Sequence, residues 1–430
     1  MHDELKNPAN GSWAPCVSAL DSAGYSRHRW YFFKEGFSPS LVDFAIENAK
    51  LRQGSLIVDP FCGSGTVPLQ AALKGFRGHG IEVNPFLAFV ARTKLIKCSP
   101  LAFDAALSKA KSGTQRGAKS PLEGFSTFSR KRGSERWLFN TPVLRAFEGG
   151  WLAASRDQGP ASDLVKLCLL EAAMDACNAA KDGKCLRYKR EWRKLHLGFD
   201  DFVEALEAQA THVREDLESG VQPNGGSRVE CGDVRKKELP EKFKLCVTSP
   251  PYLNSFDYTD VYRPELFLGR FVTSMPQLVG LRLQTLRSHV QVDWPRASEH
   301  EYGTRYAESL RLILARRERL WDRRIPEMVK AYFEDVELVL KALRRRASPT
   351  ASAWIVVSTS AYAGVEIPVD LIIAEIAGAC GWYLREVNVL RYLGRLAGQQ
   401  WKELSDLKDS KPHLRESVVI LDAMPRSRGS

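Results

Sequence analysis

One segment near the amino terminus constrains the fold more than any other, an apolar run that enters a glycine-rich turn and then a helical stretch (residues 56–74). Residues 56–59 predict a buried strand, while Gly63 and Gly65 allow positive φ angles and let a ligand approach the backbone closely. Strand, glycine turn and helix together form the first half of a doubly wound nucleotide-binding unit, in which the ligand lies at the carboxyl end of the strand.

The spacing of these glycines excludes two common phosphate-binding motifs. No Lys-Ser or Lys-Thr follows the glycines, as a P-loop requires, and no third glycine completes the dinucleotide spacing. Instead, Asp59 closes the strand just before the turn. A carboxylate at this position would repel a pyrophosphate but suits a ligand that carries an ammonium group.

A second acidic residue ends the next expected strand, residues 77–82. Glu82 follows the glycine turn by about twenty residues. In this class of fold, an acid at that spacing accepts hydrogen bonds from ribose hydroxyls. An isolated Glu at a strand end is ordinarily a solvent-exposed residue, and it is the combination with Asp59 that favours the ribose role.

Residues 248–252 form a third informative segment, Thr-Ser-Pro-Pro-Tyr, directly after the apolar run 244–247. Pro250 and Pro251 fix φ and remove two backbone donors, so the loop is stiff and rich in free acceptors. A hydroxyl, carbonyls and an aromatic ring are thus held together, an array that can bind a flat ring bearing an amine. For Pro-Pro-Tyr alone a braced turn is the simpler interpretation, and the Asp59 turn is what favours a binding site.

Strand-like and helical runs alternate along the chain. The strand-like runs are 55–59, 77–82, 228–231, 244–248, 353–359, 384–391 and 416–422, and the main helical runs are 40–50, 67–75, 327–346 and 366–379. This alternation predicts an α/β fold with a three-layer, doubly wound, mostly parallel sheet. Two insertions, 101–225 and 255–326, are too long for ordinary loops. Within them we expect a flexible loop at 108–120, an apolar helix at 162–177 and an arginine-rich helix at 304–325.

Two of these motifs carry a family resemblance. Asp-Pro-Phe-Cys-Gly-Ser-Gly-Thr at 59–66, followed by Thr-Ser-Pro-Pro-Tyr at 248–252, resembles the S-adenosylmethionine-dependent DNA methyltransferases that modify exocyclic amino groups. Residues 28–39 resemble, more loosely, the short amino-terminal motif that closes over the cofactor in that family. The resemblance covers 25–100 and 226–423 and implies a seven-stranded methyltransferase sheet with its last strand antiparallel. It leaves the helical insertion 101–225 as the candidate DNA-recognition region, and the second insertion, 255–326, as a further source of DNA contacts.

The resemblance also implies S-adenosylmethionine as the cofactor and a role for each motif residue. Asp59 and Glu82 would hold the methionyl ammonium and the ribose, and Asp233 would bind the cofactor adenine, although a turn position after Gly232 explains Asp233 nearly as well. The expected cofactor-binding residues are Phe33, Asp59, Pro60, Phe61, Cys62, Gly63, Ser64, Gly65, Thr66, Glu82, Val83, Asp233 and Val234. The expected catalytic residues are Ser249, Pro250, Pro251 and Tyr252.

Ser249 decides which base the resemblance implies. Adenine enzymes of the family more often carry Asp or Asn before Pro-Pro-Tyr, and Ser is typical of cytosine enzymes, so we expect N4-methylcytosine, with N6-adenine methylation as the alternative. Carbon-5 methylation needs a cysteine nucleophile, and the single Pro-Cys pair, Pro15-Cys16, lies outside the catalytic segments. An RNA amino-methyltransferase and a non-catalytic DNA-binding subunit are further alternatives.

The charge of the chain favours a polyanionic partner, which the resemblance implies to be double-stranded DNA. The net charge is +11 with a pI near 9.2. Residues 181–194 hold seven basic and two acidic side chains with interleaved aromatics. The expected DNA-binding residues are Lys184, Arg187, Tyr188, Lys189, Arg190, Trp192 and Arg193. A solvated helix face is the alternative there, and segments 282–289 and 305–324 are weaker candidates.

The remaining composition indicates a cytoplasmic protein without a metal or a membrane segment. Nine scattered cysteines with no Cys-x-x-Cys pair suggest reduced thiols, not disulfides or zinc ligands. No apolar stretch has membrane-spanning length, and the first residues do not read as a secretory signal. A role in a restriction-modification system, with a cognate restriction endonuclease as partner, fits the family but has no signature of its own in the chain.

Overall fold

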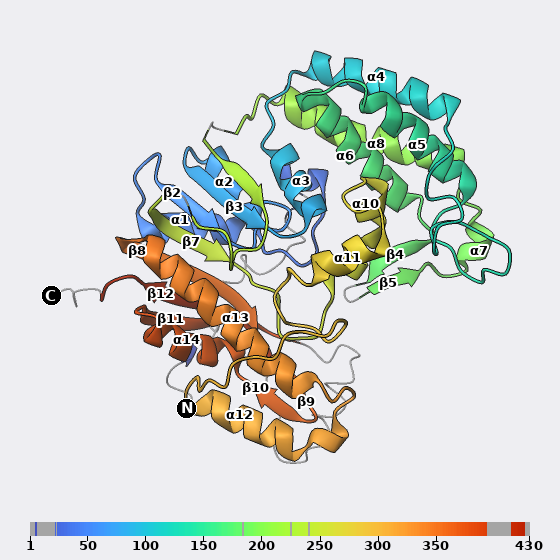
Figure 1. Ribbon diagram of the computed structural model, residues 1–430. Coiled ribbons are helices and arrows are strands. Elements are labelled where there is room, and N and C mark those ends of the chain that lie inside the picture. Colours follow the sequence, from blue (N-terminus) through green and yellow to red (C-terminus); the bar gives the residue numbers. More distant parts are fainter. Residues whose placement is uncertain are drawn as a thin grey trace.

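The structure is a computed structural model that describes residues 5–6, 22, 24–182, 185–223, 226–239, 241–393 and 414–425. Of the residues singled out in the sequence, Pro15, Cys16 and Lys184 lie outside the described part. The described chain forms a central twisted sheet flanked by helices, with a separate layer of helices beyond one edge (Figure 1).

The central sheet has the expected strands in a mostly parallel arrangement. From edge to edge the order is β1 (Leu5–Lys6), β11 (Tyr383–Tyr392), β12 (Arg415–Asp422), β8 (Ala347–Ser358), β7 (Phe243–Thr248), β2 (Leu56–Asp59), β3 (Arg77–Glu82) and β6 (Arg228–Cys231). All seven predicted strands are present, and the short β1 joins them beside β11. Strand β12 runs antiparallel to both of its neighbours, while β8, β7, β2, β3 and β6 are parallel. The predicted fold class, with the last strand antiparallel, is therefore confirmed.

Helices cover both faces of this sheet, which makes three layers. Because successive side chains of a strand point to opposite faces, Ile57 and Trp354 pack on one side and Val58 and Ile355 on the other. The first face is covered by α1 (Pro39–Ala49) and α2 (Thr66–Leu73), and the second by α13 (Ile325–Arg346) and α14 (Val369–Ala379). Helix α3 (Pro85–Lys94) follows β3 and lies between the sheet and the outlying helices.

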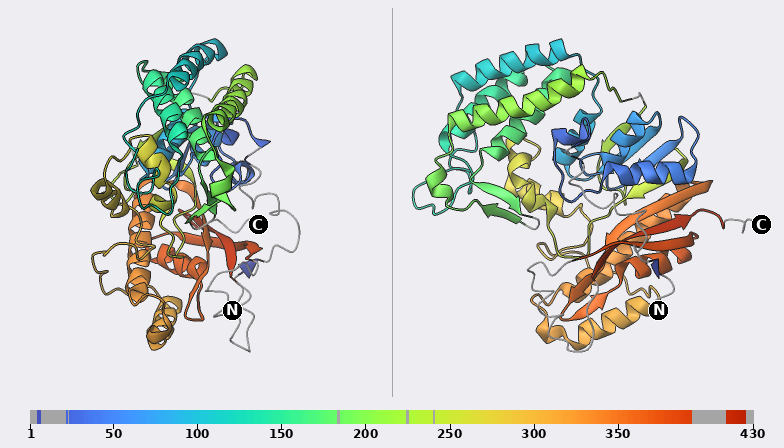
Figure 2. Two further views of the ribbon diagram at one scale, coloured as in Figure 1. Left: turned by 90° about the vertical axis from the view of Figure 1, so that its right-hand side faces the viewer. Right: turned by 180° about the vertical axis from the view of Figure 1, so that it is seen from behind.

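The first insertion forms a lobe of helices. It consists of α4 (Pro100–Arg116), α5 (Thr141–Ala154), α6 (Pro160–Asp175) and α8 (Phe199–Glu218), with the hairpin β4 (Ala179–Asp182) and β5 (Cys185–Tyr188) and the short α7 (Trp192–Leu195) at one end. Figure 2 shows this lobe beside the sheet from two further directions. One hydrophobic cluster runs from Trp30 and Phe86 into these helices, so the lobe is packed against the rest of the molecule and not tethered by a loop.

The second insertion lies between β7 and α13. It contains α9 (Tyr258–Val261), α10 (Arg263–Leu268), α11 (Met275–Arg282), α12 (Thr304–Ala315) and the 3-10 turn η4 (Arg317–Arg319). A small hairpin, β9 (Ser360–Tyr362) and β10 (Val365–Ile367), follows β8, and the 3-10 turn η3 (His28–Trp30) precedes α1. The loops of this insertion run over the carboxyl end of β7 (Figure 1).

Three sequence-based expectations about helices are wrong. The stretch 108–120, expected to be a flexible loop, is mostly the second half of α4, because Leu107 and Ala110 give it a buried face against the lobe. The expected helix 304–325 ends at Ala315, and the apolar residues beyond it belong to a turn that leads into α13. The expected helix 366–379 begins only at Val369, because the residues before it pair as strand β10.

Close backbone packing in the lobe makes one glycine a sensitive position. A Cβ added at Gly149 in α5 would lie 2.2 Å from the Gly113 carbonyl oxygen of α4, a contact with rigid backbone. We expect Gly149→Ala to lower the free energy of unfolding by about 1–3 kcal/mol, the usual effect of overpacking, as measured by denaturant titration. The matched control is Gly378→Ala in α14, where nothing lies within 4 Å of the added carbon and no loss is expected. Equal stability of the two variants would contradict the packing argument.

Candidate active site

The carboxyl ends of four neighbouring parallel strands, β7, β2, β3 and β6, meet at one pocket. It encloses about 900 Å³ of space, part of it open to solvent. Eleven of the residues expected to bind the cofactor or the base line it: Phe33, Pro60, Phe61, Gly63, Glu82, Val83, Asp233, Val234, Ser249, Pro251 and Tyr252. Segments far apart in the sequence thus converge where this class of fold places its ligand.

The glycine turn forms the floor of the pocket next to the amino-terminal motif. Gly63 has a φ of +49°, and a Cβ there would lie 2.8 Å from the Phe33 ring. Only glycine therefore lets the Phe33 ring lie directly on the turn. A hydrogen bond to α2 holds segment 28–39 in place. It joins the buried His28 ring to the Gln70 side chain at 3.2 Å.

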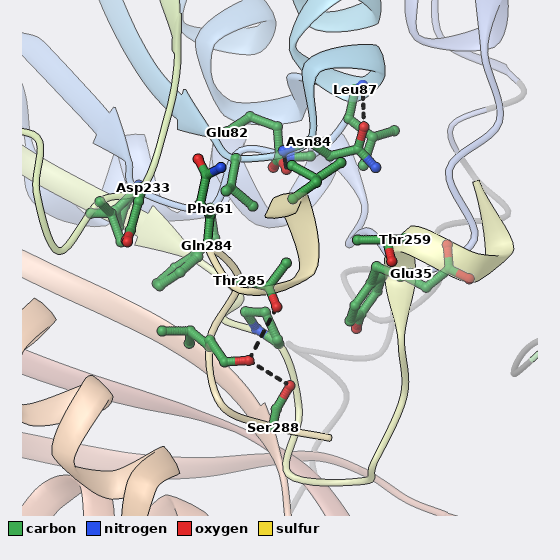
Figure 3. Close-up of a pocket in the computed structure, with 18 of the residues that line it drawn as sticks. Glu35, Phe61, Glu82, Asn84, Leu87, Asp233, Thr259, Gln284, Thr285 and Ser288 are labelled. Atoms are coloured by element: carbon green, nitrogen blue, oxygen red, sulfur yellow. Dashed lines mark hydrogen bonds between the residues drawn. The ribbon is translucent and has the colours of Figure 1, made fainter. Parts of the chain in front are cut away.

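Glu82 presents its carboxylate at the end of β3. Its two oxygens accept hydrogen bonds from the backbone N–H groups of Gly63 and Asn84, each at 2.8 Å, which fixes the side chain between the turn and α3. Burial raises the pKa of Glu82 to about 7, and these backbone bonds act in the opposite direction. Figure 3 shows Glu82 and Asn84 on one side of the pocket and Thr285 and Ser288 on the other.

Asp59 lies behind the pocket wall and does not line it. Its Oδ1 accepts a hydrogen bond from Thr248 Oγ1 at 2.6 Å and another from the Phe61 backbone N–H at 3.0 Å. Asp59 thereby ties the glycine turn to the end of β7, next to the Ser249 loop. Burial raises the pKa of its carboxyl to about 7. Of the other residues expected to bind the cofactor, Cys62, Ser64, Gly65 and Thr66 also lie outside the pocket lining.

The loop after β7 presents three of its four expected catalytic residues to the pocket. Ser249, Pro251 and Tyr252 line it, whereas the Pro250 ring faces a separate small apolar cavity on the other side of Phe61. Tyr252 is held by a 2.6 Å hydrogen bond from its hydroxyl to Glu416 of β12. Burial, reinforced by Glu416, raises the pKa of Tyr252 well above its ordinary value, and a hydrogen bond with Ser249 opposes this.

Asp233 is part of a buried chain of ion pairs. Both of its carboxylate oxygens accept bonds from Arg235 at 2.9 Å, and Arg235 also reaches Asp335 of α13 at 2.8 Å. Asp335 in turn binds Arg287 at 2.7 Å, in the segment that forms the far wall of the pocket. This series of ion pairs fixes segment 282–289 relative to the end of β6.

Sequence reasoning missed much of that far wall. The additional lining residues are Glu35, Asn84, Leu87, Gly232, Tyr258, Thr259, Leu281, Gln284, Thr285, Leu286, Ser288 and His289. Segment 282–289 was considered only for DNA contact, and nothing in its own pattern indicated a pocket wall. Asn84 had a detectable signal, since it directly follows Glu82 and precedes Pro85 as a helix cap.

Comparisons with known proteins agree with this site. Residues 28–128 match the UPF0020 family model, described as an RMKL-like methyltransferase domain. The Type II methyltransferase M.BsoBI of Geobacillus stearothermophilus is 26% identical over 453 residues, covering 94% of this chain and 87% of that protein. These matches support a place for the chain in the S-adenosylmethionine-dependent DNA methyltransferase family. The Type II methyltransferase M.AvaI of a Nostoc species is also 26% identical, over 87% of this methyltransferase and 83% of its own length.

The rRNA methyltransferase AviRa of Streptomyces viridochromogenes overlaps with a TM-score of 0.32 at 11% identity, over 90% of this chain and 86% of that one. The fold class of this chain follows from the strand order of its own sheet.

The pocket of this methyltransferase fits its cofactor, S-adenosylmethionine. Phe33 and Phe61 offer apolar faces, and Glu82 offers a fixed carboxylate for hydroxyl groups. The Asn84 side chain caps α3 through Oδ1, which leaves its buried Nδ2 without a partner among the described residues. An unpaired buried donor in a pocket wall calls for an acceptor on the ligand.

The residues expected to bind DNA lie on the helical lobe, away from the pocket lining. The stretch 181–194 is not a single helix, because its described residues belong to the β4–β5 hairpin, a turn and the start of α7, and its contact with DNA stays a prediction. Arg187, Arg190 and Arg193 are exposed, while Tyr188, Lys189 and Trp192 are half-buried. Within the described part of the chain, no cluster of His, Cys, Asp and Glu could hold a metal ion, and no helix is long and apolar enough to span a membrane.

Proposed function

We propose that this methyltransferase transfers a methyl group from S-adenosylmethionine to the exocyclic N4 amino group of cytosine in double-stranded DNA. The observation that carries the proposal is one pocket lined by both Glu82 and the Ser249 loop. A cofactor subsite and an amine-binding loop then share a single enclosed space. N6-adenine methylation is the alternative, since the same loop would hold either amine.

The cofactor, when bound, supplies an electrophilic methyl group on its sulfonium. The residues of the protein orient the amine. The amine nitrogen is a poor nucleophile because its lone pair is delocalised into the ring. The Ser249 hydroxyl and the Pro250 carbonyl would accept the two amine N–H bonds and so turn the lone pair toward the methyl. Tyr252 would stack on the base, and its bond to Glu416 holds its ring in place. Orientation of this kind supplies up to about 7–11 kcal/mol of a barrier, so no covalent intermediate is required.

The cofactor half of the proposal assigns the ribose to Glu82 and the adenine to Asp233. Asp233 already accepts from Arg235, but a carboxylate has capacity for further donors. Asp59 is assigned to the methionyl ammonium through Oδ2, because both hydrogen bonds that fix the side chain use Oδ1.

The base must leave the duplex to enter such a pocket. Flipping costs roughly a few kcal/mol, which contacts to the flanking DNA can offset. We assign those contacts to the lobe, through Arg187, Tyr188, Lys189, Arg190, Trp192 and Arg193. By analogy with the Type II names of its relatives, the proposal includes a restriction-modification role beside a cognate restriction endonuclease.

Product analysis tests this function. Unmethylated genomic DNA is incubated with the protein and tritiated S-adenosylmethionine, then digested to nucleosides and separated by chromatography. We expect label in N4-methyldeoxycytidine, and none in a parallel incubation with RNA. Label only in N6-methyldeoxyadenosine would exclude the cytosine assignment, and label in RNA but not DNA would exclude the substrate class.

A further inference from the structure

Two segments of the helical lobe come together on its surface, where Trp137 of the first contacts Trp192 of the second, 55 residues later in the sequence. One segment is the loop 129–139 between α4 and α5, and the other is the β4–β5 hairpin with α7. We call the surface that they form the arginine–aromatic ledge, made of Arg130, Arg136, Trp137, Tyr188, Trp192 and Arg193.

Hydrogen bonds to backbone carbonyls of the loop fix the two segments to each other. The Asn178 backbone N–H donates to the Leu138 carbonyl at 2.7 Å, and the Asn178 side chain donates to the Trp137 carbonyl at 3.2 Å. From the other segment, Arg193 donates to the Glu135 carbonyl at 2.7 Å. The ledge is therefore a built surface whose two halves keep one relative position.

Aromatic rings at the centre of the ledge support guanidinium groups. Trp192 packs edge-on against Trp137 at 4.6 Å between ring centroids and contacts Tyr188 at 5.1 Å. The guanidinium carbons of Arg130, Arg136 and Arg193 lie 5.2, 5.7 and 4.9 Å from the rings of Trp137, Tyr188 and Trp192, respectively. All three arginines are exposed, and of the three only Arg193 uses a side-chain donor within the described protein, toward the Glu135 carbonyl.

The charge around these rings is strongly positive. Residues 130–136 hold four basic side chains and one acid, and residues 185–196 hold five basic side chains and one acid. Two of the basic side chains in residues 185–196 form ion pairs with acids: Lys194 with Glu191 at 2.9 Å, and Arg187 with Asp182 at 2.5 Å. Among the residues that the structure describes, neither Arg130 nor Arg136 forms an ion pair, which leaves these charges available to a polyanion.

A series of contacts links the β4–β5 hairpin to the wall of the active-site pocket. Lys181, in the first strand of the hairpin, forms an ion pair with Glu265 of α10 and donates to the Tyr31 hydroxyl at 2.7 Å. Its ammonium also lies 4.5 Å from the Tyr262 ring, and the Tyr262 hydroxyl donates to Glu35 in the pocket wall at 2.6 Å. In Figure 1 the hairpin lies beside α10 and α11, with α7 farther out.

We propose that the arginine–aromatic ledge binds the phosphate backbone of the DNA duplex that flanks the flipped base. The inference rests on the proposed function and adds the loop 129–139 to it. Stacking on the rings holds the guanidinium groups in place before DNA arrives, so less side-chain entropy is lost when they bind phosphates. Such contacts give sequence-independent, salt-dependent affinity.

Salt titration of DNA binding tests the ledge. The variant carries Arg130→Gln, Arg136→Gln and Arg193→Gln, and its affinity for a fluorescent duplex is measured by anisotropy over a series of salt concentrations. We expect at least about tenfold weaker binding, and a plot of log affinity against log salt less steep by about 2–3, near one unit per lost phosphate contact. The affinity for S-adenosylmethionine is expected to stay unchanged, which also shows that the variant folds.

Two further variants make the result specific. The control variant removes the same charge from exposed positions outside the ledge, by Arg52→Gln, Arg156→Gln and Arg345→Gln. We expect it to bind DNA nearly as tightly as the wild type does. Arg→Lys changes at the three ledge positions keep the charge but lose the stacked planar group, and we expect a near-normal salt slope with weaker binding.

The outcomes separate the ledge from the proposed function. If the Gln variant keeps the wild-type affinity for DNA and the wild-type salt slope, the ledge does not bind DNA. The same conclusion follows if the charge-matched control loses as much affinity as the Gln variant. Lys variants that bind as tightly as the wild type would overturn the role of stacking. If the wild type methylates DNA and the Gln variant binds DNA as tightly as the wild type does, the proposal about the ledge is wrong but the proposed function stands. If the wild type methylates no DNA, the proposed function itself is wrong.

Discussion

Ser249→Ala is expected to lose methyl transfer while it still binds S-adenosylmethionine. Ser249 lines the pocket at the end of β7, and in the proposed function its hydroxyl accepts an amine N–H. Removal of one preorganised hydrogen-bonding group from an enzyme site typically lowers kcat by about 100-fold to 1,000-fold. We expect a loss of that order in tritiated-methyl transfer, with the dissociation constant of the cofactor, measured by calorimetry, changed little.

Two companion variants separate the amine contact from indirect effects. Ser249→Asn keeps an acceptor oxygen, so part of the activity should return. Tyr252→Phe keeps the stacking ring but removes the hydroxyl that contacts Glu416 and Ser249, and only a modest loss is expected. If the Phe variant reproduces the full loss, Ser249 acts by holding Tyr252 and not by contacting the base. Lost cofactor binding in Ser249→Ala would place Ser249 in the wrong subsite.

Glu82→Gln is expected to weaken S-adenosylmethionine binding strongly. Both Glu82 oxygens accept backbone N–H bonds, and a glutamine has only one acceptor oxygen, so its amide would face one of those donors. A buried donor left without an acceptor costs about 1–3 kcal/mol, and the lost ribose contact adds to this. We expect the dissociation constant to rise by about 10-fold to 100-fold. The control is Glu301→Gln, an exposed acid outside the pocket lining, where no change is expected.

The pH dependence of cofactor binding follows from the same carboxylate. Burial raises the pKa of Glu82 to about 7, above the ordinary 4.5, so a fraction of the unliganded protein is protonated near neutral pH. Ribose hydroxyls donate to the ionised form, so binding releases protons, and affinity should rise from about pH 6 to about pH 8. In Glu82→Gln the rise should shrink but not vanish, because burial raises the pKa of Asp59 to about 7 as well. A wild-type affinity that falls over this range would contradict the assignment.

The raised pKa values of Asp59 and Glu82 also determine how the free energy of unfolding changes with pH. Protons are bound more tightly by Asp59 and Glu82 in the folded protein than in the unfolded chain. The contribution of these groups is therefore fully present below their ordinary pKa values, and it is lost as the pH rises through about 7. Bound cofactor should reverse part of that loss.

Local patterns predicted the sheet well because each strand is specified by its own residues. The runs at 228–231 and 77–82 coincide with β6 and β3, and the others differ at their ends, β8 most, where it begins earlier than expected. Helix ends were less predictable. Composition alone indicated a loop at 108–120, but burial of Leu107 and Ala110 against the lobe stabilises a helix there. Tertiary packing overrides weak local propensity in such segments.

The sequence by itself determined the two motifs and the order in which they occur, since glycine, proline and acidic residues impose their constraints on the backbone locally. Only the tertiary structure decided which motif residues face the pocket. It put Asp59 behind the wall and Glu82 in it, and it closed the pocket with segment 282–289 through the Arg287–Asp335 ion pair. It also joined the loop 129–139 to Asn178, which precedes the β4–β5 hairpin, and to α7, which follows it. Contacts between segments far apart in the chain depend on packing and burial, which a single sequence without its fold does not specify.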